Sequence, residues 1–446
     1  MALRLWRIEA NALWGDEALT LLIAEWPTKA LFFYPVDPTP GLYYFAHKTL
    51  IGATSSVAIA RSISLVAGAL LVPIMFLLAR SSRISGLLAA TLTALNYPLI
   101  DYSQEARAYS LLLLWIGLSG YAFVSWHRNR SRVALSGFAV ANLLALYTHF
   151  IAIFWVAPMI AASFALSWHQ PQARAALRIV TYVTVFLALP QALRLVAYPK
   201  ASFHWLAQAG LADAIGRTGS VLLPLGLVER GAEYAMHSFT TVICVVIFGL
   251  MAFVAWHRRA AIRSWALQNA AAASLIAISL AAPVAIWLFG FIAKPILMPR
   301  TLLIAVPGFL LAVSLASGLI HRMAGPVAVL LYATSLAITG TARPKPDWRT
   351  VAHQVAQGLR PGDVVLVCPG WQSAAFRHAF TQKSEVPLVA LFPEGPVLME
   401  SGLGSDSNWT ASYLKNAYGR RNFVEGEAAL ASAKRVWRIN EGCDIK

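Results

Sequence analysis

The chain has 446 residues, of which 58% are hydrophobic and only 13% are charged. This composition argues against a water-soluble globular protein and is typical of a membrane protein. The formal net charge of +16 does not indicate a nucleic-acid-binding protein, because the basic residues lie in short gaps between apolar runs.

An adjacent acidic pair, Asp16 and Glu17, lies in residues 1–56, which precede the first long apolar run. Acidic residues are favoured in the first turn of a helix, so the stretch GDEALTLL by itself predicts a helix start. A second stretch, VDPTPGLYY, combines a proline-rich turn with two tyrosines typical of the membrane–water interface. It contains Asp37 and Tyr43.

Residues 57–340 form the predicted membrane domain. A bilayer core of about 30 Å needs about 20 apolar residues in a helix, and ten stretches approach this length. These stretches are Val57–Ala79, Ile84–Ile100, Ala108–Trp126, Val133–Phe150, Ile151–Trp168, Leu177–Ala197, Ser238–Trp256, Ala266–Gly290, Thr301–Ile320 and Ala324–Gly340.

Alternate gaps between these stretches are basic and contain no Asp or Glu, as in HRNRSR and HRRAAIR. This pattern is typical of cytoplasmic loops and predicts that residues 1–56, Asp101–Tyr109, the loop from about Tyr198 to His237, Ile292–Arg300 and the segment from Thr341 lie on the outer face. The stretches themselves contain no Asp or Glu. Proton-coupled and ion-coupled transporters usually need such carboxylates, so this class is disfavoured.

The segment 341–446 predicts a small α/β domain outside the membrane. The stretch DWRTVAHQVAQGL has helical spacing, and VVLVC, VPLVALF and KRVWRI are short strands. The stretch CPGWQS is no glycine-rich phosphate loop, which argues against a nucleotide-binding domain. Cys368 and Cys443 could pair outside the cell, although separate thiols are the favoured interpretation.

Four cations are predicted at the outer ends of the apolar stretches: Arg61, Arg107, Lys294 and Arg300. Each alone is explained by contact with lipid phosphates. A carboxylate beside such cations suits sugar transfer from a lipid phosphate, because the acid takes the acceptor's proton while the cations stabilise the departing phosphate. In the long outer loop, Trp205 could stack on a sugar or serve as an interfacial anchor.

Several motifs in order resemble one known group of proteins. They are LWGDEALT, DPTPGLYY, ARSISLVAGALLVPIMFLLAR, YPLIDYSQEARAYSLLLL, PRTLLIAVPGFLLAVS and DWRTVAHQVAQGLRPGDVVLV. The series is similar to bacterial GT-C glycosyltransferases of the group that includes protein O-mannosyltransferases and the aminoarabinose transferase of lipid A. The resemblance covers nearly the whole chain.

The resemblance implies a glycosyltransferase in the bacterial inner membrane, with its C-terminal domain on the periplasmic side, a polyprenyl-phosphate sugar as donor and a hydroxyl group as acceptor. It implies inversion at the anomeric centre. Asp16 would be the catalytic acid of the first loop with Glu17 beside it, and Arg107, Arg300, Lys294 and Arg61 would face the donor phosphate. Asp37, Tyr43, Asp101 and Glu105 would line the substrate site. No metal or other cofactor is expected.

Two departures from the family pattern stand out. Thr39 and Gly41 replace the His and the second Pro of the first-loop pattern, and only fifteen residues precede Asp16, where the family has a further span. Two other functions remain open at this stage: a flippase or transporter for lipid-linked sugars, and a polysaccharide polymerase or ligase.

Overall fold

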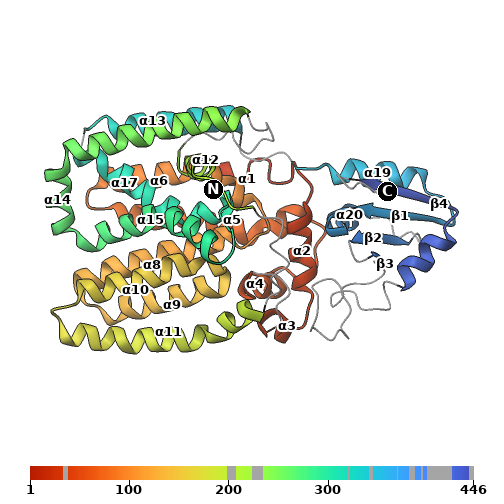
Figure 1. Ribbon diagram of the computed structural model, residues 1–446, viewed down its shortest axis with the longest axis horizontal. Helices are drawn as coiled ribbons and strands as arrows, with labels where there is room; N and C mark the ends of the chain where they lie inside the picture. The colour runs from red at the N-terminus through yellow and green to blue at the C-terminus, as the bar shows by residue number, and fades with distance from the viewer. Residues whose placement is uncertain are drawn as a thin grey trace.

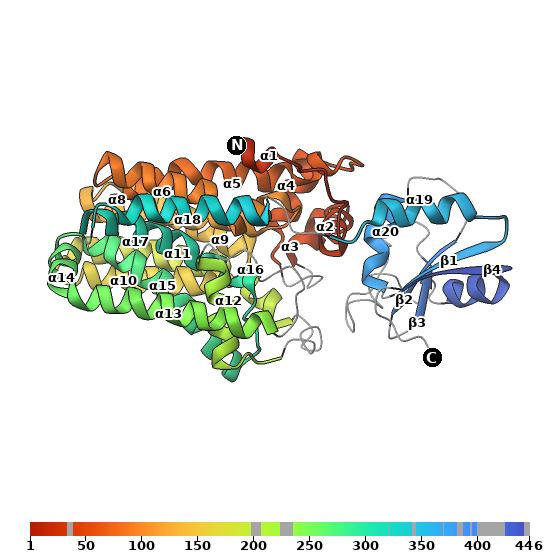
Figure 2. The same ribbon diagram turned by 90° about the horizontal axis from the view of Figure 1, so that it is seen from above.

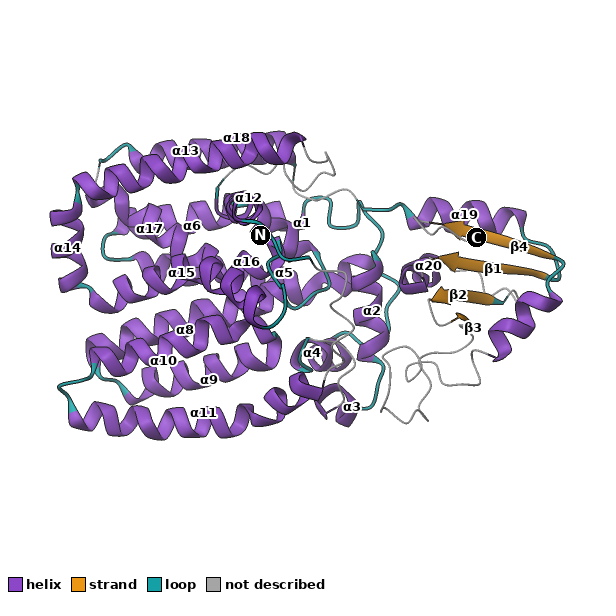
Figure 3. Ribbon diagram, viewed as in Figure 1, coloured by secondary structure: helices purple, strands orange, loops and turns teal. Residues whose placement is uncertain are grey.

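The computed structural model describes residues 1–33, 39–197, 207–223, 235–319, 321–340, 345–368, 370–380, 387–392, 395–398 and 424–440. Figure 1 shows a bundle of long helices at one end and a smaller unit with the sheet at the other. The N-terminal helices α2, α3 and α4 lie between these two parts. Strands are confined to the C-terminal unit among the residues drawn as ribbon (Figure 3).

Each of the ten predicted apolar stretches is mostly helical over its described residues. The first coincides with its prediction, and the others begin or end within a few residues of theirs. The helices are α5 Val57–Ala79, α6 Arg83–Leu95, α7 Tyr97–Asp101, α8 Tyr109–Asn129, α9 Arg132–Thr148, α10 Ile153–Leu166, α11 Pro171–Ala197, α13 Ala235–His257, α15 Ala270–Ile292, α17 Val306–Leu319 and α18 Ala324–Thr339.

These helices differ widely in length, and the prediction of ten spans is not confirmed. Within the described residues, five helices are long and apolar enough to cross a bilayer: Val57–Ala79, Tyr109–Asn129, Pro171–Arg194, Ala270–Ile292 and Pro299–Ala316. A sixth candidate is bent by 78° between Thr241–His257 and α14, Arg259–Gln268. The other four apolar helices have only 10–17 residues, and a helix rises only about 1.5 Å per residue.

Serine residues set several of the helix starts. The hydroxyl of Ser56 accepts a hydrogen bond from the Ile59 N–H at the start of α5. Ser82 and Ser131 cap α6 and α9 in the same way. Each cap satisfies a backbone N–H that has no partner within its own helix. Ser82 and Ser131 therefore mark the points at which two basic turns end and apolar helices begin.

The remaining helical segments before the C-terminal unit, and the 3-10 turns of the described residues, are short. They are α1 Ala2–Leu5, α2 Gly15–Ala24, α3 Thr28–Phe33, α4 Leu42–Leu50, α12 Leu211–Leu222 and α16 Pro299–Leu302, with 3-10 turns at Tyr102–Gln104, Phe150–Ala152, Leu303–Ala305 and Gly370–Gln372. Helix α12 belongs to the long predicted outer loop. It packs against α13, α16 and α17.

The C-terminal unit has the predicted α/β character. It contains α19 Trp348–Gly358, β1 Asp363–Cys368, α20 Ser373–Ala379, β2 Leu388–Phe392, β3 Gly395–Leu398 and β4 Arg435–Asn440. The strand order is β3-β2-β1-β4. Strand β1 is parallel to both β2 and β4, whereas β2 and β3 are antiparallel. The helix and three strands predicted from the sequence are present, and β3 is an addition that the prediction missed.

Helix α20 of the C-terminal unit packs directly against α2, as Figure 2 also shows. One apolar cluster joins Ala12, Leu13 and Ala18 near the N-terminus to Trp348 and Phe376. The acidic pair therefore lies at the end of the bundle that carries the C-terminal unit. Cys368 in β1 is disulfide-bonded, so the expectation of a separate thiol is wrong at this position.

Candidate active site

The acidic pair occupies the first turn of α2, as the sequence predicts. The helix begins after Trp14, whose N–H donates to the Glu17 carboxylate at 3.3 Å. Adjacent residues of a helix point about 100° apart, so the two carboxylates face different surroundings. The Asp16 side chain is 35% exposed, whereas that of Glu17 is fully buried.

Glu17 has partners for both of its carboxylate oxygens. Arg61 of α5 donates from Nε to Oε1 and from Nη2 to Oε2, each at 2.8 Å. The Ala106 N–H donates to Oε1 at 2.8 Å, and the Lys345 ammonium donates to Oε2 at 3.1 Å. Such a two-pronged arginine–carboxylate pair fixes both position and orientation. Glu17 thereby ties α2 to α5, to the Ala106 turn and to Lys345.

Lys345 was not predicted from the sequence as a residue of the site. It lies just before α19 and forms ion pairs of 3.1 Å with both Glu17 and Glu105, with its own side chain only 7% exposed. The stretch GTARPKPDWR contains several basic residues, and nothing in their spacing indicates which one turns inward. Only the docking of the C-terminal unit on α2 brings Lys345 to the two acids.

The pKa of Glu17 is determined by opposing effects. Burial by itself would raise it, but the Lys345 ammonium, the Arg61 guanidinium and the Ala106 N–H lower the pKa from 4.5 to about 2. The carboxylate therefore stays ionised and strongly bound at neutral pH. A base that holds its charge this firmly is poorly suited to accept a substrate proton.

This low pKa predicts a pH dependence of stability. Glu17 binds a proton less readily in the folded chain than in the unfolded chain, so its stabilising effect is present above pH 4.5 and is lost as the pH falls toward about 2. We expect the difference in melting temperature between wild type and Glu17→Gln to shrink as the pH is lowered from about 6 to about 3. A constant difference across this range would contradict the assignment.

Asp16 faces a different set of cations. Its Oδ2 accepts a hydrogen bond from Nη1 of Arg300, in α16, at 3.2 Å. The Arg107 Nη1 donates to the Asp16 carbonyl oxygen and to the Thr20 hydroxyl, each at 3.2 Å. Residues separated by almost the whole membrane domain are thus brought together. Asp16 is the partly exposed acid of the pair: its carboxylate contacts the Arg300 guanidinium, and its backbone carbonyl accepts from the Arg107 guanidinium.

The structure orients Arg61 away from this exposed group. Besides Glu17, its guanidinium donates to the carbonyl oxygens of Ile8, Asn11 and Ala12. Arg61 is nearly fully buried, so it holds the N-terminal segment as well as Glu17. Lys294 lies on the connection between α15 and α16 and is half-buried.

The predicted substrate-binding residues are mostly buried. The Tyr43 hydroxyl is hydrogen-bonded to Ser64 Oγ at 2.8 Å, and Ser64 in turn donates to the Arg107 carbonyl oxygen at 2.9 Å. Tyr43 therefore supports the turn that carries Arg107. Asp101 and Glu105 are buried on the same segment. Asp37 and Trp205 lie outside the described residues.

No group of three or more His, Cys, Asp and Glu side chains that could hold a metal ion forms within the described ranges. The expectation that no metal is needed stays a prediction. The site contains the partly exposed carboxylate of Asp16 and, near this residue, the guanidinium groups of Arg300 and Arg107. This arrangement can accept a proton and bind an anion.

The fold defines a class of protein. The chain is a multi-pass membrane protein, in which five helices of the described residues are long and apolar enough to cross a bilayer. It is similar in structure to ArnT from Cupriavidus metallidurans in the apo state, with a TM-score of 0.54 and 13% sequence identity, over 85% of this chain and 82% of that one. No protein-family model and no curated protein matches the sequence. At this low identity the similarity concerns the fold.

Proposed function

We propose that the protein is a membrane glycosyltransferase that moves a sugar from a polyprenyl-phosphate donor to a hydroxyl acceptor. The reaction takes place at the outer face of the bacterial inner membrane, and the acceptor is a glycolipid, a polysaccharide or a protein. The observation that carries the proposal is the 3.2 Å contact between Asp16 and Arg300. The GT-C-like fold supports the same class of reaction.

In this proposal Asp16 is the general base. It accepts the proton of the acceptor hydroxyl as the hydroxyl oxygen bonds to the anomeric carbon of the sugar. The bond from that carbon to the phosphate oxygen breaks, and the polyprenyl phosphate leaves with the electron pair. Attack from the side opposite the phosphate inverts the anomeric centre. Arg300 and Arg107 stabilise the negative charge that develops on the departing phosphate.

Glu17 and Arg61 have positioning roles in this proposal. The buried Glu17 fixes the first turn of α2 through Arg61, Lys345 and the Ala106 N–H, and this turn carries Asp16. Arg61 was expected to bind the donor phosphate, but its contacts with Glu17 and three backbone carbonyls favour the structural role. Lys294 remains a third candidate for the donor phosphate, and Asp37 and Trp205 remain candidates for sugar contacts.

The orientation across the membrane is part of the proposal. Basic gaps without acids favour a cytoplasmic position for the end of the bundle opposite to α2. The disulfide at Cys368 favours an oxidising compartment for the C-terminal unit. Both observations support the periplasmic side for the C-terminal unit and for Asp16.

The reaction can be tested with purified protein in lipid nanodiscs. A panel of polyprenyl-phosphate sugars is supplied with a crude envelope acceptor fraction, and free polyprenyl phosphate is measured. Wild type releases it, and Asp16→Asn does not. A flippase would move the intact donor without breaking the bond between the sugar and the phosphate. A polymerase that uses diphosphate-linked donors would release no polyprenyl phosphate from any donor of the panel.

Arg300 provides a second test of the same site. We expect Arg300→Gln to lower donor turnover by about 10²-fold, because removing one preorganised donor from a developing anion typically has such an effect. Stability should change little, since the Asp16 partner is partly exposed. Steady-state donor kinetics give the readout, with Lys29→Gln, an exposed cation of α3, as the control. Unchanged donor kinetics in Arg300→Gln would instead assign Arg300 to lipid contact.

A further inference from the structure

A second cationic site lies at the end of the helical bundle that is remote from α2. A cavity of about 670 Å³ is formed there by the end of α8, the start of α9 and the start of α11. Its lining residues are Trp126, Arg130, Arg132, Leu135, Gln170, Pro171, Gln172, Ala173 and Ala176. Cavities of about 300–1,000 Å³ are typical of small-molecule sites.

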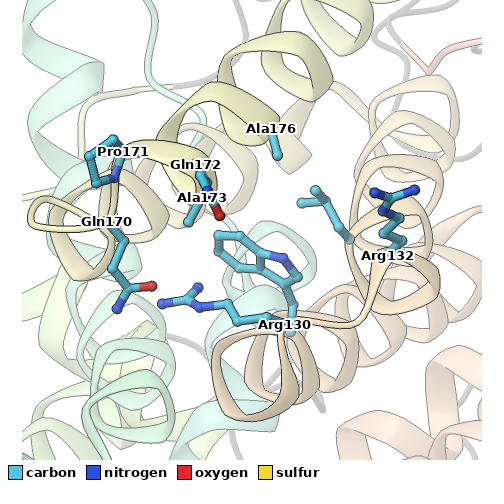
Figure 4. Close-up of a pocket in the computed structure, with 9 residues that line it drawn as sticks. Arg130, Arg132, Gln170, Pro171, Gln172, Ala173 and Ala176 are labelled. Atoms are coloured by element: carbon cyan, nitrogen blue, oxygen red, sulfur yellow. The ribbon is translucent and has the colours of Figure 1, made fainter.

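The Arg130 side chain is held in place at this cavity. Arg130 ends α8 in a left-handed backbone conformation with φ of 50°, which is uncommon for a residue other than glycine. Its guanidinium carbon lies 4.5 Å from the centre of the Trp126 ring, a cation–π contact. Figure 4 shows the Arg130 side chain extending toward Gln170, while Arg132 lines another part of the cavity.

The positive charge of this cavity has no acidic counterpart on the elements that form it. The sequence contains no Asp or Glu from Ala106 to Ala212, a range that includes α8, α9 and α11 entirely. The first backbone N–H groups of α11, at Gln172 and Ala173, add partial positive charge to the guanidinium groups. The cavity is therefore suited to an anion that comes from outside the chain.

The surroundings also indicate an apolar part of this ligand. Leu135 and Ala176 belong to an apolar cluster at the base of the cavity. Along α11, Ile179, Val183 and Phe186 continue from Ala176 at spacings of three and four residues, and all three are exposed. Residues at these spacings form one stripe along a helix. An apolar strip thus leads from the cavity along the lipid-facing surface.

We propose that this cavity binds the headgroup phosphate of an anionic phospholipid. Arg130 and Arg132 contact the phosphate, the start of α11 adds hydrogen-bond donors, and an acyl chain lies along Ile179, Val183 and Phe186. The strip adjoins the cavity on the exposed surface of α11, so one lipid molecule can contact both, whereas a soluble phosphate compound would contact the cavity alone. Basic pockets between membrane helices are known sites for anionic lipid headgroups.

Native mass spectrometry of delipidated protein tests this site. The protein is titrated separately with dioleoyl phosphatidylglycerol, dioleoyl phosphatidylcholine and inorganic phosphate. We expect phosphatidylglycerol to bind most tightly. Each cation should contribute about fivefold in affinity, so Arg130→Gln combined with Arg132→Gln should weaken phosphatidylglycerol binding by about 25-fold. Arg83→Gln removes an exposed charge elsewhere and should bind like wild type.

A second pair of variants avoids any loss of the Trp126–Arg130 contact. Ala173→Glu places a carboxylate at the cavity. Its negative charge is compatible with the first turn of α11 but repels an anionic ligand. Ala173→Gln adds a neutral side chain of the same size. We expect only Ala173→Glu to weaken phosphatidylglycerol binding. Equal binding by both Ala173 variants, or equal affinity for the two lipids, would overturn the proposal. Tight binding of inorganic phosphate alone would assign the cavity to a soluble anion instead.

Discussion

Asp16→Asn is expected to reduce sugar transfer by about 10²- to 10⁴-fold, the usual contribution of a general base. The amide has nearly the same size but cannot accept the acceptor's proton. Because the Asp16 side chain is 35% exposed and its ion pair with Arg300 is partly exposed as well, the loss of this carboxylate should lower the melting temperature little. The measurement is the rate of polyprenyl phosphate release by purified protein, with thermal unfolding of the same sample.

Glu25→Gln is the matched control for Asp16→Asn. Glu25 is an exposed acid at the opposite end of α2, so its replacement removes the same charge from the same helix without touching the proposed site. We expect wild-type rates from this control. An active Asp16→Asn variant would remove Asp16 from the mechanism, and an equal loss in both variants would point to a general effect of charge on α2.

Glu17→Gln is expected to act mainly on folding. In this variant the buried Arg61 loses its carboxylate partner. Lys345 loses its ion pair with Glu17 and keeps its ion pair with Glu105. Breaking a buried ion pair by removing one partner typically costs about 3–5 kcal/mol. We therefore expect a large fall in melting temperature and in yield, with activity lost through displacement of α2.

A double variant separates this effect from chemistry. Glu17→Gln combined with Arg61→Gln removes both members of the buried pair and leaves the ion pair between Lys345 and Glu105 in place. Removing both partners leaves fewer uncompensated buried charges, so the double variant should be more stable than the sum of the single effects predicts. Strict additivity of the changes in unfolding free energy would show that Glu17 and Arg61 are not coupled.

The positions of the membrane helices could be predicted from the sequence because apolar length and polar caps act locally. Val57–Ala79 is helical over the whole predicted stretch, since Ser56 caps its start and an arginine turn follows its end. The number of spans could not be predicted in the same way. Helices such as α6 and α18 are apolar but short, and hydropathy alone does not decide whether such a helix crosses a bilayer.

The candidate site was predictable in part. The sequence placed Asp16 and Arg300 on the same face, and the structure brings their side chains within 3.2 Å. The different surroundings of Asp16 and Glu17 could not be read from two adjacent acids, because they depend on which side of α2 meets α5 and Lys345. Lys345 itself was missed, since its partners lie more than 200 residues away in the chain.

Mass spectrometry of cell-envelope glycolipids and polysaccharides is the most direct test of Asp16 as the catalytic base of a sugar transfer. Cells lacking the gene are supplied with wild type, Asp16→Asn or Glu25→Gln at equal membrane levels. We expect one sugar-modified envelope component to be present with wild type and with Glu25→Gln, and absent with Asp16→Asn. The same component in cells that carry Asp16→Asn, or an unchanged envelope in all strains, would contradict this expectation.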